Sequence, residues 1–138
     1  MGSWGSRSFD NDTAMDWLLK LHKTSDFSLV RKALLRTSEP ATEPCSHSAD
    51  EEALAAAEIV ASCLGHPPPE KEDLQSWVRQ HINWFTPEIL TLARQTIAAI
   101  KTNSQLREMW SGRTGDVRPE WLNSVTDLEQ RLWHEPAP

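Results

Sequence analysis

Apolar residues recur along the chain at the three- and four-residue spacing of helices that bury one face. Between residues 12 and 22, Ala14, Trp17, Leu18 and Leu21 form a single apolar stripe with polar residues between them. Similar spacing predicts further helices over residues 26–36, 48–64, 70–83, 86–102, 104–110 and 119–133. No segment gives a convincing strand pattern. The sequence therefore predicts an all-α protein, built as a single compact bundle of six to seven short helices.

Residues with known capping preferences stand at the ends of these segments. Residues 10–12 are Asp, Asn and Asp, and any of them can accept a backbone N–H bond at the start of the first helix. Ser48 and Glu51 have the spacing of a capping box before the alanine-rich third helix. Gly65 can supply a left-handed C-cap, and the prolines at 67–69 prevent that helix from continuing.

The length and composition are those of one folded unit. The chain has 138 residues, of which 38% are hydrophobic and 25% are charged, so a single helical domain over residues 1–138 is expected. Residues 37–47 contain two prolines and predict a flexible loop, and residues 135–138 predict a frayed tail. The sequence has no membrane span, no secretory signal and no disulfide framework, so we expect a cytoplasmic protein without membrane contact.

The net charge of −6 comes from one segment. Residues 1–48 carry six basic and six acidic side chains, and residues 76–138 carry seven of each. An acidic surplus repels phosphate, which argues against nucleic-acid binding and favours a basic protein partner. The alternative is that these acids stabilise helix N-termini. The surplus lies in residues 49–75, where Lys71 is outnumbered by Asp50, Glu51, Glu52, Glu58, Glu70, Glu72 and Asp73.

Tryptophan is unusually frequent, with seven copies and no tyrosine. Most of these rings are expected in the core, because each can bury about 150–250 Å². Trp84 and Phe85 are adjacent and cannot both face one core, so one of them is expected to be partly exposed or to pack under the N-terminal motif. It would serve either as a plug between helices or as an anchor for a partner. The predicted partner-binding residues are Asp50, Glu51, Glu52, Glu70, Glu72, Asp73 and Trp84.

Metal and cofactor sites find little support. Cys45, His47, Cys63 and His66 are the right types for tetrahedral zinc, but a helix of about fifteen residues, roughly 20 Å long, separates the two pairs. Whether the four converge is left open. The acidic cluster at residues 10–12 lacks the later ligands of an EF-hand loop. We therefore predict no metal and no cofactor.

Catalytic patterns are also missing, although a second class of function stays open. There is no Gly-x-Ser-x-Gly and no His-Glu-x-x-His. His81 falls on an apolar helix face beside Trp77, which is typical of a packed histidine. The alternative is a small enzyme or metal-dependent protein whose site would use His66, His81 or the acids Asp10, Asp12 and Asp16. Such a site should place a histidine and a carboxylate in one concave pocket.

The first seventeen residues carry a dense motif, with Trp4-Gly5, Phe9, Asn11-Asp12 and Asp16-Trp17. The chain resembles an uncharacterised bacterial family catalogued as domain of unknown function 4259. The resemblance lies in this motif, in the alanine-rich residues 53–61, in Gly65-His66-Pro67, in Trp77-Val78 and in residues 106–110. The resemblance implies a small bacterial cytoplasmic helical protein and carries no catalytic residues. Whether the motif from Trp4 to Asp16 has a function or only locks the first helix stays open.

Together these features predict a non-enzymatic protein-binding module that uses an acidic helical face. One concrete form is an immunity or antitoxin-type inhibitor of a basic bacterial protein, because acidic residues can steer and hold a cationic surface. The identity of the partner and the oligomeric state do not follow from the sequence.

Overall fold

The computed structural model describes residues 8–24, 26–38, 47–66, 68, 74–102, 104–112 and 115–133. The fold is all-α, as the apolar spacing predicts. Its elements are α1 (Asp12–Leu21), α2 (Ser28–Ser38), α3 (His47–Cys63), α4 (Leu74–His81), the 3-10 helix η1 (Ile82–Trp84), α5 (Pro87–Thr102), α6 (Gln105–Met109) and α7 (Pro119–Trp133).

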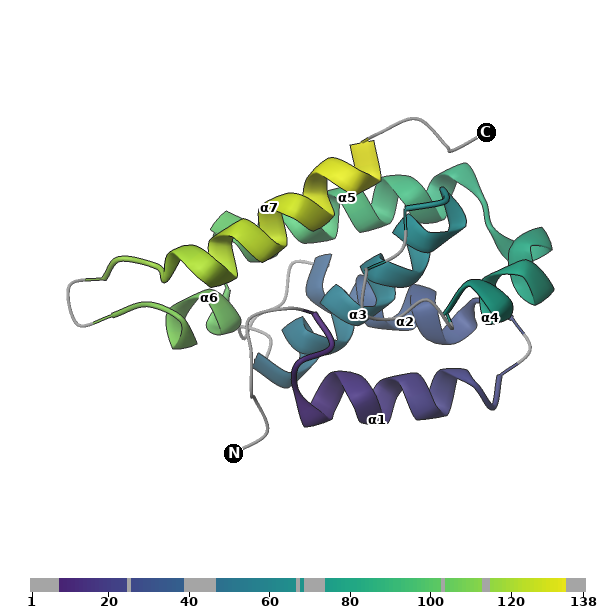
Figure 1. Ribbon diagram of the computed structural model, residues 1–138, viewed down its shortest axis with the longest axis horizontal. Coiled ribbons are helices and arrows are strands. Elements are labelled where there is room, and N and C mark those ends of the chain that lie inside the picture. The colour runs from purple at the N-terminus through teal and green to yellow at the C-terminus, as the bar shows by residue number, and fades with distance from the viewer. Residues whose placement is uncertain are drawn as a thin grey trace.

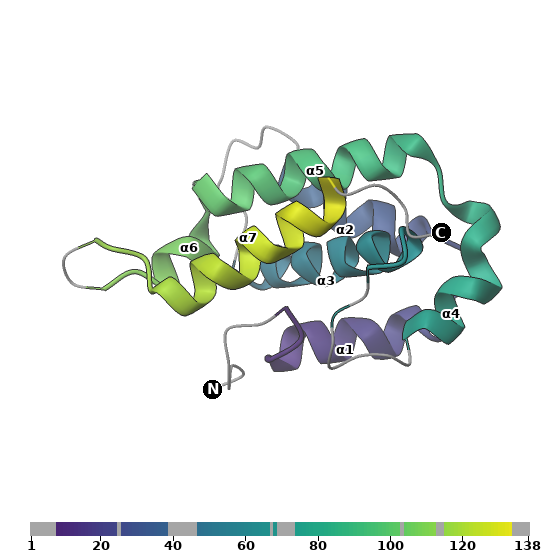
Figure 2. The ribbon, with the colours of Figure 1, turned by 45° about the horizontal axis from the view of Figure 1, so that its top comes forward.

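Helix α3 is the centre of the bundle. It contacts α1, α2, α4, α5, α6 and α7. Figures 1 and 2 show α1 on one side of α2 and α3, and α5 with α7 on the other side. Helix α4 and η1 lie at one end of the molecule, and α6 lies toward the opposite end (Figure 1).

The alanines of α3 explain why so many helices can reach it. Five of them have no exposed surface, which places small side chains around most of the helix. Without a large side chain in the way, neighbouring helices approach closely from several directions. The alanine-rich sequence of α3 therefore accounts for its central position in the bundle. The five are Ala53, Ala55, Ala56, Ala57 and Ala61.

The start of α1 is closed by the residues that precede it. Asn11 is the N-cap: its Oδ1 accepts from the backbone N–H of Ala14 at 2.7 Å, and its Nδ2 donates to the Ser8 carbonyl at 3.3 Å. Phe9 is 1% exposed and belongs to the core. The predicted cap is therefore present, and it is formed by Asn11. The first part of the opening motif, Trp4-Gly5, lies outside the described residues, whereas Asp12, Asp16 and Trp17 belong to α1.

The ends of α2 and α3 correct two expectations. Helix α2 continues to Ser38 and α3 already begins at His47, so the ends of the predicted loop over residues 37–47 are helical. Ser48 consequently lies inside the first turn of α3 and not before it. At the other end of α3, Gly65 adopts a left-handed φ of 85°, as expected for a C-cap. The remainder of the loop, residues 39–46, and the tail at 135–138 lie outside the described residues.

Two connections use features that the helical pattern does not specify. Residues 82–84 tighten into η1, which has no buried residue, before Thr86 Oγ1 accepts the Ile89 N–H at 3.3 Å near the start of α5. Between α6 and α7, Ser111 and Val117 form an isolated antiparallel bridge. The Gly112 N–H donates to the Asp116 carbonyl at 2.8 Å within this turn. None of the helices in the described part of the chain has both the length and the apolar character to cross a membrane.

Candidate functional site

The predicted acidic face is only partly a surface. Asp50 and Glu51 are 2% and 4% exposed, so neither is available to contact a basic partner. Asp50 instead has a structural role, because its Oδ2 accepts the backbone N–H of Leu106 at 3.1 Å at the start of α6. Placing these two carboxylates among exposed partner-binding residues is therefore wrong. A helical spacing alone did not show that α6 would cover this side of α3.

Another acid of this segment is consumed by an internal ion pair. Glu58 is 3% exposed, and its two carboxylate oxygens accept from Arg131 of α7 at 2.7 and 3.1 Å. Arg131 also donates to Asp127 and to the His66 carbonyl. Burial disfavours the charged guanidinium, but the hydrogen bond and charge of Glu58, together with Asp127, more than offset this and hold the pKa of Arg131 above its usual value.

Of the remaining predicted partner-binding acids, the structure describes only Glu52. Glu52 on α3 is half-buried, whereas Glu70, Glu72 and Asp73 lie outside the described residues. The prediction that this segment contacts a basic partner stays a prediction, and among its described acids Glu52 has the most accessible side chain.

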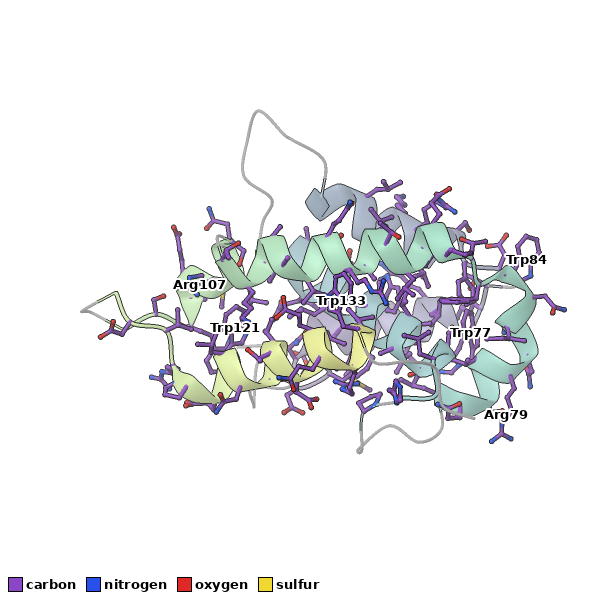
Figure 3. All side chains as sticks on the ribbon, turned by 90° about the horizontal axis from the view of Figure 1, so that it is seen from above. Trp77, Arg79, Trp84, Arg107, Trp121 and Trp133 are labelled. Carbon is purple, nitrogen blue, oxygen red and sulfur yellow. The ribbon has the colours of Figure 1, made fainter. Side chains whose placement is uncertain are left out.

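Trp84 behaves as the adjacent aromatic pair predicts. Its side chain is 54% exposed on η1, while Phe85 packs against the core. Figure 3 shows Trp84 at one end of the molecule, the same end as Trp77 and Arg79 of α4. Ile82 on the same short helix is 41% exposed. An exposed indole on an element without buried residues makes little contribution to the core, and its role as an anchor for a partner stays a prediction.

Trp84 also borders a pocket of about 510 Å³ between α2, η1 and the start of α5. This volume is in the range of roughly 300–1,000 Å³ that is common for ligand sites. Its lining combines apolar and charged side chains: Asp26, Phe27, Ser28, Arg31, Lys32, Leu35, Trp84, Thr86 and Ile89.

A stack of three rings supports the wall of this pocket. Phe27 stacks on Trp77 with centroids 5.5 Å apart, and Trp77 stacks on His81 at 4.1 Å. His81 Nδ1 lies 2.7 Å from the Trp77 carbonyl oxygen, which ties the imidazole to α4. The buried Trp77 Nε1 has no hydrogen-bond partner among the described residues. Phe27 is thus held in place before anything binds, which reduces the ordering that binding requires.

The charged groups of the pocket differ in how far they are already satisfied. Asp26 Oδ1 accepts the Ser28 hydroxyl at 2.6 Å and the Ser28 N–H at 3.0 Å. These two bonds, and to a smaller extent the charge of His81, lower the pKa of Asp26. Arg31 pairs with Glu88 of α5. Lys32 is exposed and has no ion-pair partner within the part of the chain that the structure describes.

The residues proposed as metal ligands do not form a cluster in the described part of the molecule. No group of three His, Cys, Asp or Glu side chains there could hold a metal ion. Cys45 lies outside the described residues, as does the side chain of His47. Burial raises the pKa of the Cys63 thiol to about 12, so it stays protonated. The pocket beside Trp84 is lined by a carboxylate, Asp26, but by no histidine.

Part of this site has no counterpart in the sequence pattern. The helical spacing of residues 26–36 leaves Arg31 and Lys32 on the polar side of that helix. Nothing in the sequence indicates that Trp84, which follows two helices later, lies beside them. The pairing depends on how α2 packs against α5. The adjacent aromatics at 84 and 85 were the one usable signal.

Comparison with known proteins gives a family without an assigned activity. Residues 2–124 match the model of a family described as a domain of unknown function, DUF4259. The matched region includes every element from α1 to α6 and the first part of α7. No curated protein matches the chain, and no solved structure matches it.

Proposed function

The chain belongs to the DUF4259 family, and we propose that it is a non-enzymatic protein-binding module whose contact surface is centred on Trp84. The surface consists of Ile82 and Trp84 on η1 together with the adjoining pocket between α2 and α5. We refer to it below as the Trp84 surface.

The observation that carries this proposal is the exposed indole beside a preformed pocket. Trp84 is 54% exposed and lines the pocket together with Phe27, Leu35 and Ile89. Tryptophan is enriched among the residues that dominate binding energy, and such residues pair with apolar pockets. The rim adds charged groups that can orient a partner. A surface of this kind suits recognition better than catalysis, because most of the exposed area that lines the pocket is apolar.

The proposal also includes a basic protein as the partner, as the sequence predicts. The acidic composition of residues 49–75 supports a basic partner that contacts Glu52, and an inhibitor of the immunity or antitoxin type is one form of such a module. The buried positions of Asp50 and Glu51 weaken that support. The Trp84 surface is therefore the primary candidate.

Affinity capture with matched baits tests the proposal. Immobilised wild type, Trp84→Ala and Trp133→Ala are exposed to lysate of the source organism, and bound proteins are quantified by mass spectrometry. Trp133 is a suitable control because it is also exposed, at 63%, but stacks on Arg94 and does not line the pocket. Figure 3 shows it alongside α5 and α7, away from Trp84.

A true partner should be captured by wild type and by Trp133→Ala and lost at least about tenfold with Trp84→Ala, as for a binding hot spot. Circular dichroism must show that all three baits have the same helical content and melting temperature. Equal recovery of every captured protein by the two tryptophan variants would contradict a role for the Trp84 surface.

A further inference from the structure

We infer that the Trp84 surface binds a protein segment in which an apolar side chain stands next to an acidic one. The apolar side chain would enter the pocket between Phe27, Leu35 and Ile89, and the acidic side chain would pair with Lys32. This inference rests on the proposed function and adds the chemistry of the partner. It predicts that this chain, although its own net charge is −6, binds an acidic segment of its partner.

The apolar half of the inference follows from the pocket floor. Phe27 and Ile89 are 3% and 1% exposed, so the floor is already part of the folded core. The stack with Trp77 fixes Phe27, and Trp84 forms the exposed side of the pocket. An aliphatic or aromatic side chain placed there would gain about 25 cal/mol for each Å² removed from water, without first ordering the floor.

The acidic half follows from which charges are already engaged. Asp26 accepts two bonds from Ser28, and Arg31 is paired with Glu88. Lys32 is the lining cation without an ion-pair partner among the described residues. An ammonium group offers three donors and no acceptor, so its complement is a carboxylate. The Arg31 guanidinium, which lies in the same lining, has more N–H donors than the one that Glu88 accepts among the described residues, and these would reinforce this preference.

A displayed peptide library on the full chain tests the inference. Random twelve-residue peptides are selected on wild type, and binders to Trp84→Ala are removed in each round. The enriched peptides are synthesised, and their Kd values are measured by fluorescence polarisation. We expect each to combine an aromatic or branched aliphatic residue with Asp or Glu within one helical turn.

Charge variants then test the role of Lys32. Lys32→Glu should weaken the enriched peptides by roughly tenfold, because it replaces attraction by repulsion, and the wild-type affinity should fall as salt rises. Lys20→Glu is the matched control: Lys20 is an exposed lysine of α1 that does not line the pocket. It should leave Kd within about twofold, which controls for the change in net charge.

The outcomes separate the inference from the function on which it rests. Peptides that need Trp84 but are neutral or basic, and that ignore Lys32→Glu, would overturn the acidic preference and leave the binding module standing. Failure to enrich any Trp84-dependent peptide would overturn both. In that case anilinonaphthalene sulfonate, an apolar anion, is the second probe: dye binding that is lost in Trp84→Ala and Lys32→Glu would assign the pocket to a small organic anion.

Discussion

Arg131 and Glu58 form a charged contact that the bundle largely encloses. Their side chains are 15% and 4% exposed, and they join α7 to the middle of α3. Glu58→Gln removes the carboxylate charge and leaves the guanidinium with Asp127 as its charged partner. We expect a loss of about 2–3 kcal/mol in the free energy of unfolding, below the roughly 3–5 kcal/mol of a fully broken buried pair. Urea denaturation monitored by circular dichroism measures it.

The double variant Glu58→Met with Arg131→Met separates the ion pair from the shape of the site. Apolar replacement of a whole buried pair is often close to neutral, so this variant should be more stable than Glu58→Gln. A Glu58→Gln protein that unfolds at the wild-type urea concentration would show that the pair is solvated and contributes little.

Cys63 offers a second test at the residue scale. Burial raises the pKa of its thiol from 9.0 to about 12. The nucleophile is the thiolate, so at about pH 8 the folded protein should react with iodoacetamide at Cys63 more than tenfold more slowly than the urea-unfolded protein. Peptide mapping by mass spectrometry distinguishes Cys63 from Cys45. Equal rates in the two states would show that the end of α3 opens readily.

At the scale of elements, α6 depends on a side chain far away in the sequence. This short helix receives a cap from Ser104, whose hydroxyl accepts the Arg107 N–H at 3.0 Å, and a second one from buried Asp50 on α3. Asp50→Ala should leave the Leu106 N–H without this acceptor and cost about 1–3 kcal/mol. Amide hydrogen exchange should increase most at residues 105–109.

Ser104→Ala is the matched comparison, because it removes a local cap worth about 1 kcal/mol and leaves the contact between α3 and α6 in place. If Asp50→Ala destabilised the whole protein while exchange in α6 stayed at the wild-type rate, the carboxylate would not be holding this helix. The buried acid would then need a different explanation.

The elements show what the sequence can and cannot predict. The stripe of Trp17, Leu18 and Leu21 and the cap at Asn11 located α1, because both signals are local. The sequence predicts an exposed position for Asp50 and Glu51, because carboxylates near a helix start are usually exposed. Their burial depends on packing against other parts of the fold, which local spacing does not show. The pocket beside Trp84 has the same origin, since Phe27 and Ile89 meet only when α2 packs on α5. Contacts between distant segments therefore account for most of what sequence reasoning missed.

At the scale of the whole molecule, the other helices can pack closely on α3 only because its side chains there are small. Ala56 has no exposed surface, and α3 is packed on several sides. Ala56→Leu should force neighbouring helices apart, lowering the melting temperature by roughly 3–10 °C, as expected for an overpacked core. Calorimetry measures the shift.

Ala98→Leu on α5 is the control for this experiment, because the same atoms are added at an exposed helical position. Alanine and leucine are both strong helix formers, so the change there should stay within about 0.5 kcal/mol. If both variants melted at the wild-type temperature, α3 would have room for larger side chains. In that case, close packing of the other helices on α3 would not determine how α2 and α5 are arranged. The pocket between α2 and α5 would then need another explanation.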